Sequence, residues 1–176
     1  MKYIHSAYDP GGHLKPAYMS RLEGILGRAA ELRMAVILSL AYFGIDYRYI
    51  EGPDAVRCMA DEIVDWLADR DYRHVLIEIA NERDEIRTRS GGVSAEELIP
   101  RIGQRSGDKY PDGFRLLCST SGGGGWLPSD DLIELMDFIL VHGNGQSPAD
   151  HVRMIRDLRS RDVFKAKPKP IVFNEA

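Results

Sequence analysis

The chain has 176 residues, of which 44% are hydrophobic and 28% charged, values that are ordinary for a globular protein. Its formal net charge of −4, without a cluster of Lys and Arg, argues against a nucleic-acid partner. No apolar run approaches the roughly 20 residues that a membrane-spanning helix needs, and the first residues lack the apolar stretch of a signal peptide. We therefore expect neither nucleic acid nor membrane as a partner. The sequence leaves the localisation open, and secretion is compatible with it.

Amphipathic helices and short apolar strands are predicted to alternate along the chain. Helices are expected over residues 17–33 and from starts near Pro53, Ser94, Ser129 and Ser147. At Ser94 the pattern Ser-Ala-Glu-Glu is typical of a capping box, in which the Ser and Glu side chains bond backbone N–H groups of the first turn. Strands are expected at residues 34–40, 74–79, 114–120, 138–142 and 170–173. This alternation predicts βα units, a parallel sheet and the α/β fold class.

Polar residues follow the apolar runs, at the carboxyl ends of the expected strands. They are Tyr42, Asn81-Glu82, Ser119-Thr120, His142-Gly143-Asn144 and Asn174-Glu175. In a (β/α)8 barrel, the TIM barrel, active sites are built at that end of the strands. A Rossmann-type sheet is the competing architecture, but the glycines at 122–125 lack its GxGxxG spacing. We therefore favour the barrel.

Two of the expected strands end in the same dipeptide. Asn81-Glu82 follows the run Ile-Glu-Ile-Ala, and Asn174-Glu175 follows Pro-Ile-Val-Phe. Two carboxylates that face one another supply the groups that glycosidic bond cleavage requires. These motifs resemble strands four and seven of the retaining (β/α)8 glycoside hydrolases of clan GH-A, the cellulase-like group similar to glycoside hydrolase family five. The resemblance implies that Glu82 is the general acid/base and Glu175 the nucleophile, with carboxyl groups about 5–5.5 Å apart.

The strand count agrees with this resemblance, but the barrel is incomplete. If Glu82 ends strand four, the expected strands are numbers three to seven, and residues 3–7 are the tail of strand two. A barrel of this class needs about 250 residues, and strand one, most of strand two and strand eight have no counterpart. We therefore expect residues 1–176 to form one partial TIM-barrel domain, an inactive fragment of a longer protein. Its exposed strand edges favour self-association.

The resemblance also implies residues that bind the substrate. Asn81 matches the clan's asparagine that hydrogen-bonds the sugar 2-hydroxyl, and His142 and Asn144 end strand six, where the clan often has a histidine. Trp126, after the glycines, is a candidate platform for sugar stacking. Tyr42 stands where many relatives have His, and no Tyr follows His142, so both positions depart from the clan. The corresponding alternatives are a turn-forming Asn81, a structural His142 and a core Tyr42.

The sequence thus predicts a retaining glycoside hydrolase that acts on a β-linked poly- or oligosaccharide by double displacement, without cofactor or metal. The first alternative is a carbohydrate-binding or structural barrel that has lost the chemistry, favoured by the departures at Tyr42 and His142. The second is a lyase or a metal-dependent hydrolase, for which His142 is the clear ligand candidate among the histidines. Cys58 and Cys118 lie in apolar patterns without CxxC spacing, so we expect both thiols to be free and buried.

Overall fold

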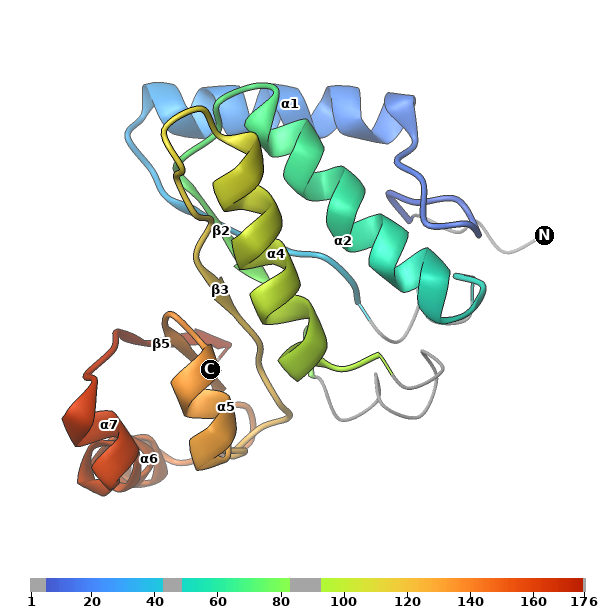
Figure 1. The fold of residues 1–176 in the computed structure, drawn as a ribbon. Helices are drawn as coiled ribbons and strands as arrows, with labels where there is room; N and C mark the ends of the chain where they lie inside the picture. Colours follow the sequence, from blue (N-terminus) through green and yellow to red (C-terminus); the bar gives the residue numbers. More distant parts are fainter. Residues whose placement is uncertain (1–5, 43–48, 83–92, 176) are drawn as a thin grey trace.

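The computed structural model describes residues 6–42, 49–82 and 93–175. In these residues helices and strands alternate, as the sequence predicts (Figure 1). The helices are α1 (Pro16–Glu31), α2 (Gly52–Ala68), α4 (Ala95–Lys109), α5 (Asp130–Leu135), α6 (Pro148–Ser160) and α7 (Asp162–Ala166). The strands are β1 (Val36–Ser39), β2 (Val75–Glu78), β3 (Cys118–Ser119), β4 (Ile139–His142) and β5 (Ile171–Glu175). None of the helices in this part of the chain is long and apolar enough to cross a membrane.

The strands pair in parallel, each with a neighbour in the sequence. β1, β2 and β3 form a three-stranded sheet, in which Val36 lies opposite Val75 and Ser39 opposite Glu78. β4 and β5 form a separate parallel pair. This arrangement confirms the predicted α/β class with parallel strands.

The ladder is broken between β3 and β4, and the strand predicted at 114–120 is regular only over Cys118–Ser119. Asp137, just before β4, causes the break. Its carboxylate accepts a hydrogen bond from the Cys118 N–H at 2.8 Å and pairs with Arg115, while its own N–H donates to the Cys118 carbonyl at 2.9 Å. Because a side chain takes one of the bonds that a strand ladder makes, the expected single sheet is divided in two.

The core is built from the apolar faces of the helices and from strands that are apolar on both sides. In α2 the apolar residues recur every three or four positions and so form one stripe. The residues of this stripe are buried: Val56, Met59, Ala60, Ile63, Val64 and Leu67. Ile77 in β2 and Leu140 and Val141 in β4 are completely buried. Continuous burial of this kind is typical of parallel strands that helices cover.

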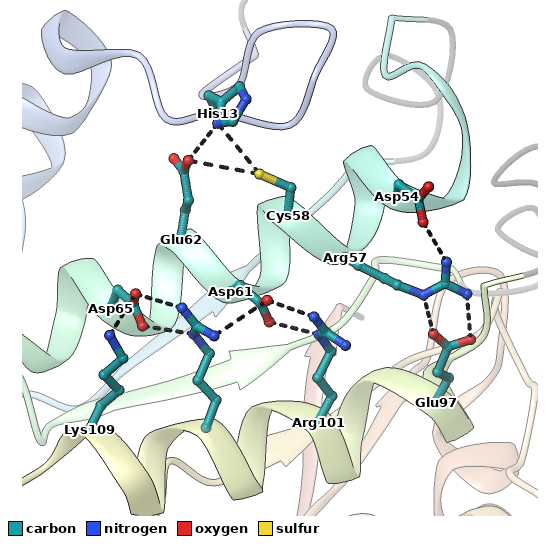
Figure 2. Close-up of polar contacts among 11 residues, drawn as sticks. His13, Asp54, Arg57, Cys58, Asp61, Glu62, Asp65, Glu97, Arg101 and Lys109 are labelled. Carbon is teal, nitrogen blue, oxygen red and sulfur yellow. Dashed lines mark hydrogen bonds and ion pairs between the residues drawn. The ribbon is translucent and has the colours of Figure 1, made fainter.

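A row of ion pairs joins α2 to α4, which lie side by side (Figure 1, Figure 2). We call it the α2–α4 ladder. Its partners recur one helical turn apart on each helix and 40 residues apart in the chain. The pairs are Arg57 with Glu97 at 2.6 Å, Arg101 with Asp61 at 2.6 Å and Arg105 with Asp65 at 2.7 Å. Lys109 adds a second cation to Asp65 at 2.9 Å.

The helix starts agree with the sequence, but one predicted cap does not form. Ser129 accepts a hydrogen bond from a first-turn N–H of α5, and Ser147 makes a complete capping box with Asp150 in α6. Ser94 is the residue before α4, as expected, yet its side chain makes no capping hydrogen bond. The capping-box prediction at Ser94 is therefore wrong, because Glu97 is drawn into the α2–α4 ladder instead.

Candidate active site

Three ionisable side chains meet at the carboxyl ends of the strands. His142 is the last residue of β4, Glu175 is the last of β5, and Glu82 follows β2 by four positions. One donor atom from each of the three lies within 4.8 Å of the other two. His142 Nδ1 is 3.7 Å from an oxygen of each carboxylate. The fold thus brings the two glutamates of the Asn-Glu motifs together, with a histidine beside both; we call these three residues the rim triad.

Glu175 is held by two side-chain amides. Asn81 Nδ2 donates to one carboxylate oxygen and Asn144 Nδ2 to the other, both at 2.7 Å. These hydrogen bonds, first that from Asn81 and then that from Asn144, hold the pKa of Glu175 below its ordinary value of 4.5 despite partial burial. A carboxylate fixed on both oxygens and kept ionised is suited to act as a nucleophile.

Glu82 has an unusual backbone conformation. Its φ is +58°, in the left-handed region that a residue with a side chain seldom adopts. Its N–H donates to Ser121 Oγ at 3.2 Å, and the Ser121 hydroxyl donates in turn to the buried Glu78 at 2.6 Å. Such strain is found at functional sites, where the surrounding structure enforces it. Ser121 did not stand out in the sequence; its one signal was its position just beyond the Ser119-Thr120 strand end.

His142 is completely buried, and neither ring nitrogen has a hydrogen-bond partner among the described residues. Buried polar atoms are normally hydrogen-bonded, so this histidine calls for an explanation. Its neighbours offer two. The imidazole ring can interact electrostatically with the two carboxylates that lie 3.7 Å away. Alternatively, the rim triad can hold a divalent metal ion, since imidazole and carboxylate are both metal ligands.

The other predicted site residues lie around the rim triad in different ways. Tyr42 pairs with Asn81 in a parallel β-bridge and is 52% exposed, so it is not a core residue. Trp126 is half-buried and packs against the core. Its ring covers Gly122, where an added Cβ atom would come within 2.3 Å of it. The Gly125 N–H donates to the His142 carbonyl at 2.9 Å, which ties the glycine run to the rim.

No protein-family model matches the chain, and no curated protein matches its sequence. Its fold, however, resembles solved glycoside hydrolases. A glycoside hydrolase family 5 protein from Bacteroides vulgatus ATCC 8482 has a TM-score of 0.59 at 11% identity, covering 90% of this chain and 33% of that one. PbGH5A, a glycoside hydrolase family 5 enzyme from Prevotella bryantii B14, has a TM-score of 0.51 at 13% identity, covering 94% and 57%. An endo-beta-N-acetylglucosaminidase from Cordyceps militaris in apo form has a TM-score of 0.50 at 16% identity, covering 92% and 53%.

These likenesses define the fold as similar to that of glycoside hydrolases, an α/β fold with parallel strands. At identities of 11–16% they bear on the fold alone. The chain spans between a third and somewhat more than half of the length of these proteins.

Proposed function

We propose that the chain carries the two catalytic carboxylates of a retaining, cellulase-like glycoside hydrolase that acts on a β-linked poly- or oligosaccharide. The observation that supports this most directly is the rim triad, with carboxylate oxygens of Glu82 and Glu175 within 4.8 Å of one another at the strand ends. Retaining enzymes hold their two carboxyl groups about 5–5.5 Å apart, whereas inverting enzymes leave a wider gap for water.

In the proposed reaction Glu175 attacks the anomeric carbon while Glu82 donates a proton to the leaving oxygen. The bond from the sugar to the leaving group breaks and a glycosyl ester with Glu175 forms. Glu82, now ionised, takes a proton from water, which attacks the same carbon and releases Glu175. The low pKa of Glu175 favours the first step, because an ionised carboxylate is the attacking group.

The substrate contacts proposed for the remaining residues follow from where they lie. Asn81 bonds Glu175 through its amide nitrogen, which leaves its side-chain oxygen for a sugar 2-hydroxyl. Tyr42, beside Asn81 and half exposed, and Trp126 offer aromatic surfaces on which a sugar ring can stack. His142 and Asn144 flank the nucleophile.

We further propose that residues 1–176 are part of a larger (β/α)8 barrel. β1 stands at the end of its sheet in the described part of the chain. Beside it, a cavity of about 190 Å³ is lined by residues that include Tyr18, Leu38 and Tyr42. Ile25 in α1, Leu32 directly after it and Met34 before β1 are more than half exposed. An open strand edge and exposed apolar side chains invite a further strand or a second copy of the chain. Light scattering should therefore show self-association of the isolated chain that grows with concentration.

Substitutions of the two glutamates test the catalytic assignment in the full-length protein that carries these residues. Glu175→Ala should abolish turnover of an aryl β-glycoside, and Glu82→Ala should lower it by about 10²–10⁴-fold. Azide needs no general base, so it should restore turnover to Glu82→Ala and give the β-glycosyl azide. In Glu175→Ala, azide should take the place of the nucleophile and give the α-product.

Glu134→Ala, which removes an exposed carboxylate on α5, is the control and should leave turnover unchanged. If Glu82→Ala or Glu175→Ala also left turnover unchanged, the proposal would be wrong.

The two alternatives from the sequence make different predictions in the same assays. A barrel that has lost its chemistry would bind an oligosaccharide in calorimetry but show no turnover, even as the intact protein. A metal-dependent hydrolase, which the unpartnered ring of His142 favours, would lose turnover on treatment with a chelator and regain it with added metal. The two-carboxylate mechanism predicts turnover that a chelator does not affect.

A further inference from the structure

A second cluster of metal-binding side chains lies on α2, on different elements from the rim triad. Cys58 and Glu62 stand one helical turn apart, and His13 reaches them from the loop that precedes α1 (Figure 2). One donor atom from each of the three lies within 4.8 Å of the others. We propose that His13, Cys58 and Glu62 form a Zn²⁺ site.

Two of the three distances between the donor atoms fit a tetrahedral zinc site. With ordinary Zn–S, Zn–N and Zn–O bonds, a tetrahedron places sulfur roughly 3.5 Å from each of the other ligands and nitrogen roughly 3.4 Å from oxygen. Cys58 Sγ is 3.5 Å from His13 Nδ1 and 3.8 Å from Glu62 Oε1. His13 Nδ1 and Glu62 Oε1 are 2.6 Å apart, because a hydrogen bond joins them. For the metal to replace that proton, His13 Nδ1 and Glu62 Oε1 must move apart by roughly 0.8 Å.

The loop that carries His13 is fastened to α2 before any metal binds. Glu62 Oε2 accepts a hydrogen bond from the Leu14 N–H at 2.8 Å, which leaves Oε1 for the cluster. Gly12 has a φ of +86°, and a Cβ atom there would lie 2.0 Å from the Ala55 carbonyl oxygen, so the loop touches the helix backbone. The His13 backbone N–H is held by Asp9 Oδ1 at 3.0 Å. Ligands fixed in this way lose little conformational freedom when the metal arrives.

The donor set selects the kind of metal. A thiol sulfur with an imidazole nitrogen and one carboxylate oxygen suits Zn²⁺, whereas Mg²⁺ and Ca²⁺ require oxygen ligands. Binding converts the Cys58 thiol to a thiolate and releases its proton to the solvent. Three protein ligands leave a fourth position, and the 61% exposed side chain of His13 opens that position to water. The bound ion would add a further link between the loop and α2.

Metal analysis of the untagged 176-residue chain tests this proposal. After incubation with Zn²⁺ and removal of excess metal, we expect one tightly bound Zn²⁺ per chain. Co²⁺ in its place should give the near-ultraviolet absorption of a cobalt–thiolate bond. Cys58→Ser should abolish that absorption, and both Cys58→Ser and His13→Asn should weaken Zn²⁺ binding at least tenfold in competition with a chromophoric chelator.

Cys118→Ser is the matched control, because it removes the other thiol of the chain while leaving the cluster intact. It should keep the bound Zn²⁺ and the cobalt absorption. Circular dichroism checks that the variants fold, and His13, which is exposed, is a position where a substitution should not unfold the chain. The proposal is overturned if the wild-type chain binds no stoichiometric Zn²⁺, or if Cys58→Ser and His13→Asn bind it as tightly as the wild type.

Discussion

The α2–α4 ladder and the rim triad are both built from charged or titratable side chains, but they are satisfied in different ways. In the ladder each carboxylate meets a guanidinium or ammonium group at 2.6–2.9 Å on the surface between two helices. In the rim triad two acids lie beside a buried histidine without a described hydrogen bond, and Glu82 has a positive φ.

This difference indicates what each region is for. Exposed ion pairs between complementary partners hold two helices in register and contribute modestly to stability. Like charges in proximity, an unpartnered buried ring and backbone strain all cost free energy, so a fold keeps them where they serve chemistry. Changes in the rim triad should therefore lower activity without lowering stability, and changes in the ladder should do the reverse.

Among the variants that compare these two regions, Glu82→Gln should have the largest effect. It preserves the size of the side chain but removes the proton donor, so turnover should fall by about 10²–10⁴-fold while the Tm stays unchanged or rises. Arg101→Gln in the ladder should lower the Tm slightly and leave turnover as in the wild type. Activity assays and thermal unfolding of both variants test whether the first loses only turnover and the second only stability. A fall in turnover for Arg101→Gln as large as that for Glu82→Gln would contradict the division of roles.

Asn144→Ala should have the next largest effect, through Glu175. Removal of one hydrogen bond to the carboxylate lowers kcat/KM by about tenfold, because a bond to a charged group is worth about 1.5–3 kcal/mol and this one is exposed. The pKa of Glu175 is held below 4.5, so activity should be lost only as the pH falls below that value. Without Asn144 the pKa rises, and the acid limb of the kcat/KM profile should move to higher pH. An unmoved acid limb would show that Asn144 does not control Glu175.

The strand and helix positions could be predicted because they depend on local patterns. Apolar runs bounded by polar residues placed all five strands, and Ser129 and Ser147 marked the helix starts. The break at β3 could not be predicted, because Asp137 reaches Cys118 across 19 residues. The loss of the capping box at Ser94 has the same cause, since Glu97 finds Arg57 40 residues away.

The membership of the rim triad was also accessible from the sequence, because Glu82, His142 and Glu175 each end an apolar run, where parallel strands present their residues to one rim. The role of Ser121 and the strain at Glu82 were not accessible, since they depend on how two loops meet. The cysteines are free as expected, but Cys58 is only partly buried, because it faces the loop of His13 rather than the core.

Relief of strain should show that Glu82 is retained at the expense of stability. Glu82→Gly should raise the free energy of unfolding by about 0.5–1 kcal/mol, because glycine adopts a positive φ without steric cost. This gain exceeds the loss that comes from a more flexible unfolded chain. Arg33→Gly is the matched control, with a φ of 56° after α1. Both should stabilise the protein in urea unfolding, whereas only Glu82→Gly should lose turnover. If Glu82→Gly were destabilising, the backbone at Glu82 would not be strained.

A double-mutant cycle on Arg105 and Asp65 should give a smaller coupling energy, of about 0.5 kcal/mol. The two side chains are 33% and 29% exposed, and solvent screens exposed pairs. The coupling should shrink further in 1 M salt, where the Debye length is about 3 Å. Urea unfolding of the wild type, Arg105→Ala, Asp65→Ala and the double variant at both salt concentrations measures it. A coupling that is large and independent of salt would mean that the ladder is shielded from solvent rather than exposed to it.

The smallest effect is the pH dependence of the ladder, and its sign can be derived. Burial works against ionisation of Asp65, but the hydrogen bonds from Arg105 and Lys109 outweigh it and hold the pKa below 3.8 in the folded protein. The ionised group therefore adds stability at pH values above 3.8, and this stability is lost as the pH falls through the folded-state pKa. The stability difference between the wild type and Asp65→Asn should be constant near neutral pH and shrink only below about pH 4. Since Asn cannot titrate, a difference that already shrinks at pH 6 would assign the pH dependence to a group outside the ladder.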